Sequence, residues 1–455
     1  MHKKFLLLLG IITVCGLYLR YIDYDKVPPW RESDDEIHYA WAGLTWLTKG
    51  TPVSWSRFES YPAFSLYRAW GVDWRLVSPM LEKPPLYSLL SGITTLVSGQ
   101  RELNEVRLTT IRLLPIALSV ITIIFIGFIG QQVFSNEIGL LAALLYAVTP
   151  TVVLSNRLSL TENLLTPLSL ITLWLFLKIK KPVKSALFLG LCAGLSALTK
   201  QSGITVIIAF GALYMYQKRW RDLALFCAIS FALLTIYPLI GFMYNGKLFL
   251  ELLSEARKIG VSGGLPQLLY TLIGRPLVGT ENLFPDGTLL LGYLLFLTSP
   301  WWFVIKDWKR TIFLAFPFTY LLYLGLTITG AETIGSGQGF WGWYAYPIFP
   351  YLIILVAFVM VDIYKSVSIY KLMLVILALG SSTIHFSLIF LPRAYHYRWQ
   401  HLMFLLIGII VSTKVIHNAA YRRRILWGLF IIFLGINIYT SFHLSQIYPS
   451  LPQPY

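Results

Sequence analysis

Apolar runs long enough to enter a lipid bilayer recur along almost the whole chain. Of its 455 residues 56% are hydrophobic and only 13% are charged, whereas soluble domains carry about 25% charged residues. This composition excludes an ordinary soluble enzyme and predicts an all-α polytopic membrane protein. Since a span needs roughly 20 apolar residues, we expect about 13 transmembrane helices. They are the runs 5–21, 112–133, 138–156, 163–179, 185–199, 202–217, 222–243, 288–305, 311–330, 344–364, 371–391, 401–416 and 425–443.

The net charge of +16 would suit a nucleic-acid-binding protein. The basic residues, however, lie between the apolar runs, where they act as topology signals and contact anionic lipid headgroups. We therefore expect a lipid bilayer and no nucleic acid as partner. The 3 cysteines all fall inside apolar runs and form no CxxC pair, so they predict neither a disulfide framework nor a metal site.

The run 86–99 decides the orientation of the chain. With 14 residues it suits an interfacial or re-entrant helix better than a span. If it does not span, most basic residues of the short segments share one face, and the positive-inside rule places the N-terminus in the cytoplasm. These residues are Lys3, Lys4, Lys178, Lys180, Lys181, Lys184, Lys218, Arg219, Arg221, Lys306, Lys309, Arg310, Lys365, Lys371, Lys414 and Arg422 to Arg424.

The resulting organisation has five parts and a multi-pass location in the plasma (inner) membrane. Residues 1–21 form the first transmembrane helix, which we prefer to a cleaved signal peptide because no small-x-small site precedes Tyr21. Residues 22–111 are an extracytoplasmic loop with amphipathic helices, 112–243 hold transmembrane helices 2–7, 244–287 are a second outer loop, and 288–455 hold helices 8–13.

The first outer loop opens with the acidic block 33–36, Ser-Asp-Asp-Glu. Ser33-x-x-Glu36 is a capping box, and Gly50 suits the end of the helix that follows. The apolar face of that helix is Ile37, Ala40, Trp41, Leu44 and Leu47. The block therefore marks either an ordinary helix start or a catalytic site, because a helix N-terminus keeps a carboxylate ionised and makes Asp35 available as a base.

A second polar cluster, Glu82-Lys83-Pro84-Pro85, lies farther along the same loop. Two prolines fit the start of a short helix, where their missing N–H groups would be unpaired anyway. The Glu-Lys pair is then either an ordinary solvated ion pair at a helix start or part of a site, in which Lys83 pairs with a phosphate or fixes a carboxylate.

Charged residues also flank the spans on the proposed outer face. Arg107 and Arg112 precede the span 112–133, where they either snorkel towards water or bind a phosphate at headgroup depth. Glu162 opens the run 163–179, with Thr161 as its cap, and Lys200 separates two short apolar runs. A lysine there is costly to bury, so it lines a polar cavity or the outer surface.

The loop 331–343 mixes glycines with aromatic residues. Trp341 and Trp343 either belong to an aromatic interfacial belt or offer flat faces to a sugar. His385, His396 and His401 lack metal-ligand spacing. His38 next to the acidic block is a weak candidate for a metal, so the sequence predicts no certain cofactor and a divalent metal only as a possibility.

Between about residues 20 and 205 these motifs follow one another in a recognisable order. They are Asp35-Glu36-x-x-Tyr39, Glu82-Lys83-Pro84-Pro85-Leu86, Val106-Arg107, Arg112-Leu-Leu-Pro, Thr149-Pro150, Thr161-Glu162-Asn and Ala197-Leu-Thr-Lys200, with Tyr344-x-Tyr-Pro-x-x-Pro350 farther on. The arrangement resembles the GT-C glycosyltransferases of the protein O-mannosyltransferase and aminoarabinose transferase type.

The resemblance implies an outward-facing active site, a polyprenyl-phosphate sugar donor and inversion at the anomeric carbon. Its catalytic acids map onto Asp35, Glu36, Glu82 and Glu162. Donor or phosphate contacts map onto Tyr39, Lys83, Arg107, Arg112 and Lys200, and sugar or acceptor contacts onto Trp341, Trp343 and Tyr344. Glu162 replaces the usual aspartate, and Trp343 stands where a basic residue often precedes the late Tyr-Pro motif.

The sequence thus predicts a glycosyltransferase with a lipid, glycan or protein of the cell envelope as acceptor. A flippase for lipid-linked sugars is the alternative, although such transporters keep ionisable residues near the membrane midplane, often in inverted repeats. An O-antigen ligase or polymerase is a third possibility, which the aspartate-led first loop disfavours.

Overall fold

The computed structural model describes residues 2–30, 33–258, 286–302, 307–327, 342–366, 408 and 419–447. The expected spans 371–391 and 401–416, the loop residue Trp341 and His385, His396 and His401 lie outside these ranges. So does most of the second outer loop beyond the end of helix α12.

Helices make up most of the described chain. The N-terminal half contains α1 (His2–Tyr21), α2 (Asp35–Lys49), α3 (Pro85–Val97), η2 (Leu103–Glu105), α4 (Leu108–Ile111), α5 (Leu113–Val133), α6 (Asn136–Val148), α7 (Pro150–Ser155), α8 (Glu162–Lys178), α9 (Pro182–Thr199), η3 (Gln201–Gly203) and α10 (Ile204–Tyr216). The remainder contains α11 (Trp220–Leu234), α12 (Ile236–Lys258), α14 (Gly287–Trp302), α15 (Trp308–Thr327), η5 (Gly342–Ile348), α16 (Phe349–Ser366), α19 (Ala419–Phe442) and α20 (Leu444–Ile447).

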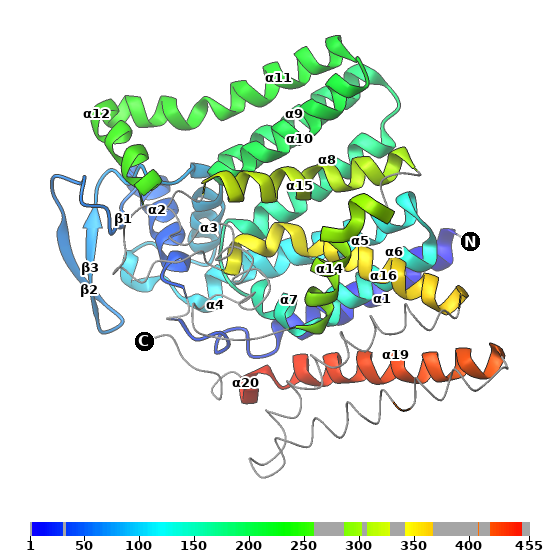
Figure 1. The fold of residues 1–455 in the computed structure, drawn as a ribbon. Helices are drawn as coiled ribbons and strands as arrows, with labels where there is room; N and C mark the ends of the chain where they lie inside the picture. The colour runs from blue at the N-terminus through cyan, green and yellow to red at the C-terminus, as the bar shows by residue number, and fades with distance from the viewer. Residues whose placement is uncertain are drawn as a thin grey trace.

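The long helices lie side by side in a bundle (Figure 1), with α2, α3 and a small sheet gathered at one end and the start of α1 at the other. In the described ranges 6 helical segments are long and apolar enough to cross a membrane, and shorter apolar helices lie among them. The chain is therefore an integral membrane protein whose fold class matches the sequence expectation.

Two expected spans are built differently in the structure. The run 138–156 is broken into α6 and α7, because Pro150 has no N–H to continue a helix and instead occupies the first turn of α7. The run 222–243 is divided between α11 and α12, and α12 extends to Lys258 through a non-helical Asn245. Part of the expected second outer loop is thus helical.

The run 86–99 forms α3, which has 13 residues. At about 1.5 Å per residue it is too short to cross a hydrocarbon core of roughly 30 Å. It packs tightly on α2, where a Cβ added to Gly43 would lie 1.7 Å from the carbonyl oxygen of Ser88, and one added to Gly92 would lie 2.3 Å from the backbone of Gly43. The two helices, α2 and α3, therefore touch through their backbones.

A three-stranded antiparallel sheet, which the sequence analysis did not predict, follows α2. Its strands are β1 (Ser54–Trp55), β2 (Ser65–Ala69) and β3 (Val72–Val77), in the order β1-β3-β2. Trp55 and Trp74 pack with Trp41 of α2 in a hydrophobic cluster separate from the main core. The sheet thereby covers the apolar face of α2, although Leu47, expected on that face, is exposed.

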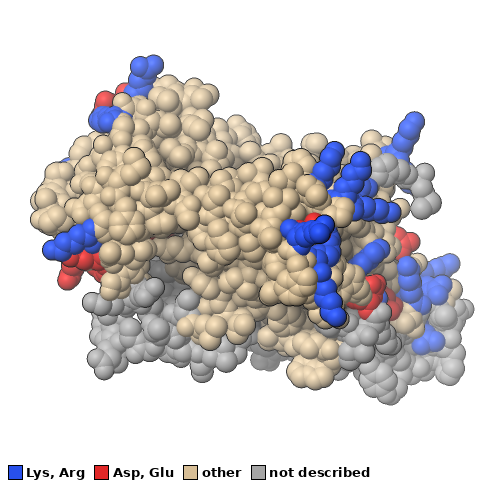
Figure 2. Space-filling model, turned by 90° about the horizontal axis from the view of Figure 1, so that it is seen from above, with Lys and Arg blue, Asp and Glu red and all other residues tan. Residues whose placement is uncertain are grey.

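The segment predicted as the second outer loop contacts the segment predicted as the first. Glu255 near the end of α12 accepts hydrogen bonds from the backbone N–H groups of Glu59 (2.7 Å) and Ser60 (3.0 Å). The phenol of Tyr244 donates to the carbonyl of Gly50 at 2.7 Å. At the opposite end of the bundle, which carries the N-terminus, lysine and arginine side chains gather on the surface (Figure 2). The positive-inside rule relates such an excess of basic residues at one end to the cytoplasmic side of the membrane.

Candidate active site

Helix α2 begins with three consecutive acids in three different environments. Asp34 is part-exposed and its carboxylate accepts a hydrogen bond from Arg57 at 3.2 Å. Asp35 is partly exposed, and Glu36 is fully buried. Because successive helical residues point about 100° apart, one helix start sends each carboxylate in its own direction. The predicted capping box does not form: Asp34 is the N-cap residue and makes no side-chain cap.

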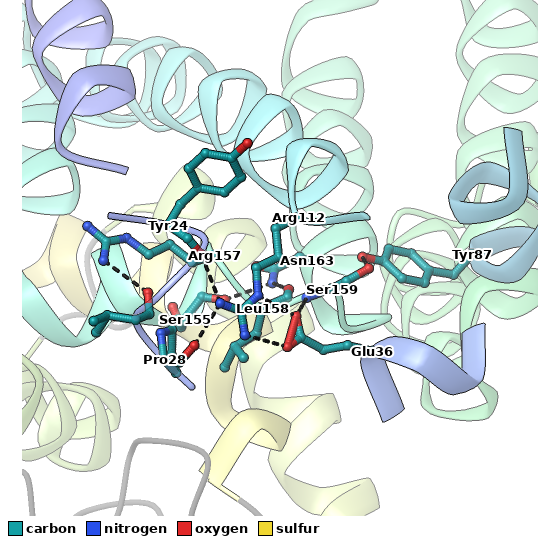
Figure 3. A network of polar contacts seen from close by, with 11 residues as sticks. Tyr24, Pro28, Glu36, Tyr87, Arg112, Ser155, Arg157, Leu158, Ser159 and Asn163 are labelled. Atoms are coloured by element: carbon teal, nitrogen blue, oxygen red, sulfur yellow. Dashed lines mark hydrogen bonds and ion pairs between the residues drawn. The ribbon is translucent and has the colours of Figure 1, made fainter. Parts of the chain in front are cut away.

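Glu36 and Arg112 form a two-point ion pair in the interior. Arg112 Nη2 lies 2.7 Å from Glu36 Oε1, and Nε lies 2.9 Å from Oε2. The remaining guanidinium nitrogen donates to the carbonyls of Tyr24 (2.8 Å) and Pro28 (2.7 Å), and the N–H of Ser159 donates to Glu36 Oε2 (Figure 3). All the polar atoms of both side chains make hydrogen bonds within the protein. We therefore assign Glu36 and Arg112 a positioning role rather than the ligand contact expected from the sequence.

The loop between α7 and α8 is fixed by the same network (Figure 3). Asn163 donates to the carbonyls of Ser155 (2.8 Å) and Leu158 (2.7 Å), and Tyr87 of α3 shares a hydrogen bond with Ser159 Oγ. Arg157 donates to two backbone carbonyls in and after α1. Burial and the nearby Arg112 lower the pKa of Arg157 to about 9. These contacts hold the start of α8, and with it Glu162, against the first outer loop.

Asp35 and Lys83 are the two charged residues of the site with the fewest protein contacts. Burial by itself would raise the pKa of Asp35, but the nearby positive charges, Lys83 first among them, together outweigh it, and the pKa is lowered. Burial by itself would lower the pKa of Lys83, but the nearby negative charges, Asp35 and then Glu82 first among them, together outweigh it, and the pKa is raised. Both groups are therefore ionised at neutral pH. Within the described residues neither makes a hydrogen bond or a direct ion pair, so both are free to meet a ligand.

Glu82 lies next to Lys83 in the chain but is buried, with 7% of its surface exposed. Ser56 donates a short hydrogen bond of 2.6 Å to its Oε2. Its Oε1 lies 3.8 Å from Nε2 of His38. Burial raises the pKa of Glu82 to about 7, although Lys83 and Ser56 act in the opposite direction.

Glu162 and Lys200 form a second ion pair at the other side of the site. Thr161 donates to the second carboxylate oxygen of Glu162 at 2.9 Å, and the Lys200 ammonium lies 3.9 Å from the centre of the Tyr344 ring. A cation placed over an aromatic face is attracted by the ring quadrupole. The structure therefore brings Glu162, Lys200 and Tyr344 together, although they are widely separated in sequence.

Other predicted residues lie at the edge of this group or apart from it. Tyr39 is buried between His38 and Tyr87, and burial near Asp35 raises its pKa well above the ordinary value. Arg107 is exposed at the start of α4. Trp343 is buried, with 7% exposed, in the core rather than open to a sugar.

Sequence reasoning missed two neighbours of the acids. His38 was considered only for a metal, and Ser56 was not considered, because their contacts with Glu82 come from folding the sheet against α2. Across the ranges described above, no three His, Cys, Asp or Glu side chains approach closely enough to hold a metal ion. The divalent metal stays a prediction, and no step below runs through it.

The described chain also has an apolar cavity of about 330 Å³ between α6, α16 and α19. Its lining includes Glu137 and Lys365, which form an exposed ion pair of 2.9 Å. It does not include any of the acids and lysines above, so it is separate from the candidate site.

Comparison with known proteins places this geometry in context. Residues 82–242 match the family model of dolichyl-phosphate-mannose-protein mannosyltransferases. The structure is similar to crystal structures of ArnT from Cupriavidus metallidurans, in the apo state (TM-score 0.59, 13% identity, 96% of this chain and 76% of that chain) and bound to undecaprenyl phosphate (TM-score 0.59, 13% identity, 97% and 76%). The fold is that of the GT-C glycosyltransferases.

A second GT-C structure supports the same assignment. The oligosaccharyltransferase AglB from Archaeoglobus fulgidus, in complex with an inhibitory peptide and a dolichol-phosphate, superposes with a TM-score of 0.53 at 14% identity, over 96% of this chain and 56% of that chain. The chain thus spans little more than half the length of AglB. A search of curated proteins gives no match.

Proposed function

We propose that this protein is a membrane glycosyltransferase that moves a sugar from a polyprenyl-phosphate donor to an acceptor on the extracytoplasmic face. The observation that carries the proposal is the pair Asp35 and Lys83, both charged and both without a protein hydrogen bond in the described chain. A base and a cation that interact electrostatically and make no protein hydrogen bond suit a reaction that removes a proton and releases a phosphate.

In the proposed step, the acceptor hydroxyl transfers its proton to Asp35 while its oxygen forms a bond to C1 of the sugar. The bond between C1 and the phosphate oxygen breaks, its electron pair stays on the phosphate, and attack from the opposite face inverts the anomeric carbon. Lys83 stabilises the charge that grows on the leaving phosphate. Polyprenyl phosphate is stable as an anion, so this departure needs no strong acid.

Glu162, Lys200 and Tyr344 complete the site on its other side. The ion pair neutralises itself, which keeps the net charge near Asp35 and Lys83 close to balance. We infer that the exposed portion of Lys200, with 18% of its side chain accessible, contacts the donor. The apolar helices around the site would supply a path for the polyprenyl tail. The end of the bundle with α2, α3 and the sheet lies opposite the end where basic side chains gather, which we take as the cytoplasmic end (Figures 1 and 2).

The rival function is transport of a lipid-linked sugar without chemistry. In the described spans the acids and lysines discussed above lie at helix ends rather than in broken helices at mid-membrane, which favours the transferase. The acceptor class, whether lipid, glycan or protein of the envelope, belongs to the proposal only at this coarse level.

Purified protein in lipid vesicles tests the proposal directly. It is incubated with several radiolabelled polyprenyl-phosphate sugars and a membrane extract as the source of acceptor. Consumption of one donor with formation of a labelled product and of free polyprenyl phosphate is expected. Movement of the labelled lipid across the vesicle without product would overturn the transferase in favour of the transporter. Lipid analysis of a deletion strain then identifies the acceptor.

A further inference from the structure

His38 is held in one neutral form by its surroundings. Its Nδ1 lies 2.8 Å from the carbonyl oxygen of Trp55. A carbonyl only accepts hydrogen bonds, so Nδ1 carries the hydrogen. Burial, and the charge of Lys83, lower the pKa of His38 to about 4. At neutral pH Nε2 therefore presents a lone pair and acts only as an acceptor.

A carboxyl group lies near that nitrogen. Nε2 of His38 is buried with no hydrogen-bond partner among the described residues, and the nearest carboxylate atom is Glu82 Oε1 at 3.8 Å. Two buried acceptors that face each other are unfavourable unless a proton lies between them. Since Nε2 has none to give, Glu82 is the group that can supply it, in a hydrogen bond that requires the 3.8 Å separation to shorten.

The charges around the pair come from several elements. Lys83 and Asp35 act on both residues. Glu255 of α12 and the phenols of Tyr61 and Tyr237 face Glu82 as well, and the ring of Tyr39 lies against His38. Lys83 is the cation that most favours ionised Glu82. A new anion at Lys83 would therefore compete with Glu82 for the same ammonium.

We propose that Glu82 takes up one proton when an anionic polyprenyl phosphate binds at Lys83, and that His38 holds this proton by accepting a hydrogen bond at Nε2. The ligand class rests on the proposed function. The balance is simple: one proton from solvent converts the Glu82 carboxylate to the acid, and the same proton returns to solvent when the phosphate leaves. His38 touches no substrate and is a positioning residue for Glu82.

Binding measured against pH tests this linkage. The probe is a polyprenyl phosphate methyl diester, because a diester keeps a single negative charge over the whole pH range, whereas a monoester would itself titrate. The full-length protein is titrated calorimetrically between about pH 6 and 8.5 in buffers of different ionisation enthalpy. We expect uptake of up to one proton per probe molecule. The affinity should fall about tenfold per pH unit above the midpoint, which is the pH at which Glu82 is half protonated in the free protein.

Variants then assign the proton to the pair. His38→Phe removes the acceptor for protonated Glu82 and should shift the midpoint down by about half to one pH unit. Ser56→Ala removes the hydrogen bond that favours the carboxylate and should shift it up. His38→Gln, which keeps an acceptor, should stay near wild type. His443→Gln is the matched control, since His443 also bonds a backbone carbonyl through Nδ1 but lies beyond the end of α19.

The outcomes separate this inference from the function. Binding of the diester without proton uptake or pH dependence would overturn the inference and leave the transferase in place. Equal midpoints for His38→Phe, His38→Gln and wild type would remove His38 from it. If the diester fails to bind wild type at any pH, the polyprenyl-phosphate site itself is wrong.

Discussion

Glu36 and Arg112 meet in a two-point ion pair with neither side chain exposed to solvent. The pair joins the start of α2 to the start of α5, and the N–H of Ser159 adds the loop before α8. Asp35 is the residue next to Glu36, so the direction of the proposed base depends on an interaction that takes no part in the chemistry.

Replacing Arg112 should lower the stability of the folded protein, because its role is structural. Arg112→Ala leaves the buried Glu36 charge without a partner, and breaking such a pair costs about 3–5 kcal/mol. Arg112→Lys should also destabilise, because lysine lacks the two-pronged guanidinium. The thermal unfolding temperature of the full-length protein in detergent is the measurement. Arg107→Ala, at an exposed position, is the control, and an unchanged unfolding temperature for Arg112→Ala would contradict this account.

Asp35→Asn should abolish most transfer while the protein still folds. A general base contributes about 10²–10⁴-fold to the rate, and an amide cannot accept the proton in its place. Initial rates with the labelled donor give the effect. Asp34→Asn is the matched control, because Asp34 lies one residue earlier and pairs with Arg57 at the surface. Equal losses in the two variants would mean that the acidic helix start as a whole matters, and not Asp35.

Lys83→Met should lower the rate and change its pH dependence. Loss of one charge-stabilising group costs about 10²–10³-fold. Lys83 also lowers the pKa of Asp35, so without it that pKa rises and the acidic limb of the rate profile moves to higher pH. Lys49→Met, which removes a surface lysine paired with Glu102 at 3.3 Å, is the control. A reduced rate with an unmoved acidic limb would separate Lys83 from Asp35.

Glu82→Gln should stabilise the protein only at pH values above the ordinary glutamate pKa of 4.5. Burial raises the pKa of Glu82 from 4.5 to about 7 in the folded state. Because the folded-state pKa is raised, protonated Glu82 contributes fully to the stability of wild type below the pKa of the unfolded state. Wild type loses this stability as the pH rises towards 7 and Glu82 ionises. Glutamine does not titrate, so the variant gains in unfolding temperature across that window. Glu102→Gln, at the surface, should show no such trend, and a gain that is already complete at about pH 4 would refute the assignment.

Local patterns in the sequence predicted much of this fold because they depend on near neighbours. The apolar runs predicted most described helices, Gly50 ends α2 with a positive φ of 73°, and the short run 86–99 forms the 13-residue α3. The Ser33-x-x-Glu36 pattern failed because a distant partner, Arg112, binds the carboxylate that a capping box would have used. A buried charge gains more from a guanidinium than from one backbone N–H.

The site was predictable as a set of residues but not as a set of pairs. Asp35, Lys83, Glu162 and Lys200 stood out because charges next to apolar runs are rare. Which of them would neutralise one another depended on tertiary contacts. His38 could not be recognised from the sequence, because its role depends on the carboxyl group of Glu82, just before α3, and on the carbonyl of Trp55 in the sheet.

The contact of Gly43 with Gly92 makes the proposed site sensitive to substitutions at these two glycines. Asp35 and His38 belong to one of these helices, whereas Glu82 and Lys83 immediately precede the other. The separation between Asp35, the proposed base, and Lys83, the proposed phosphate contact, therefore depends on how closely two main chains approach. A single methyl group added at either glycine, although apolar, would force apart the two helices that carry the proposed site.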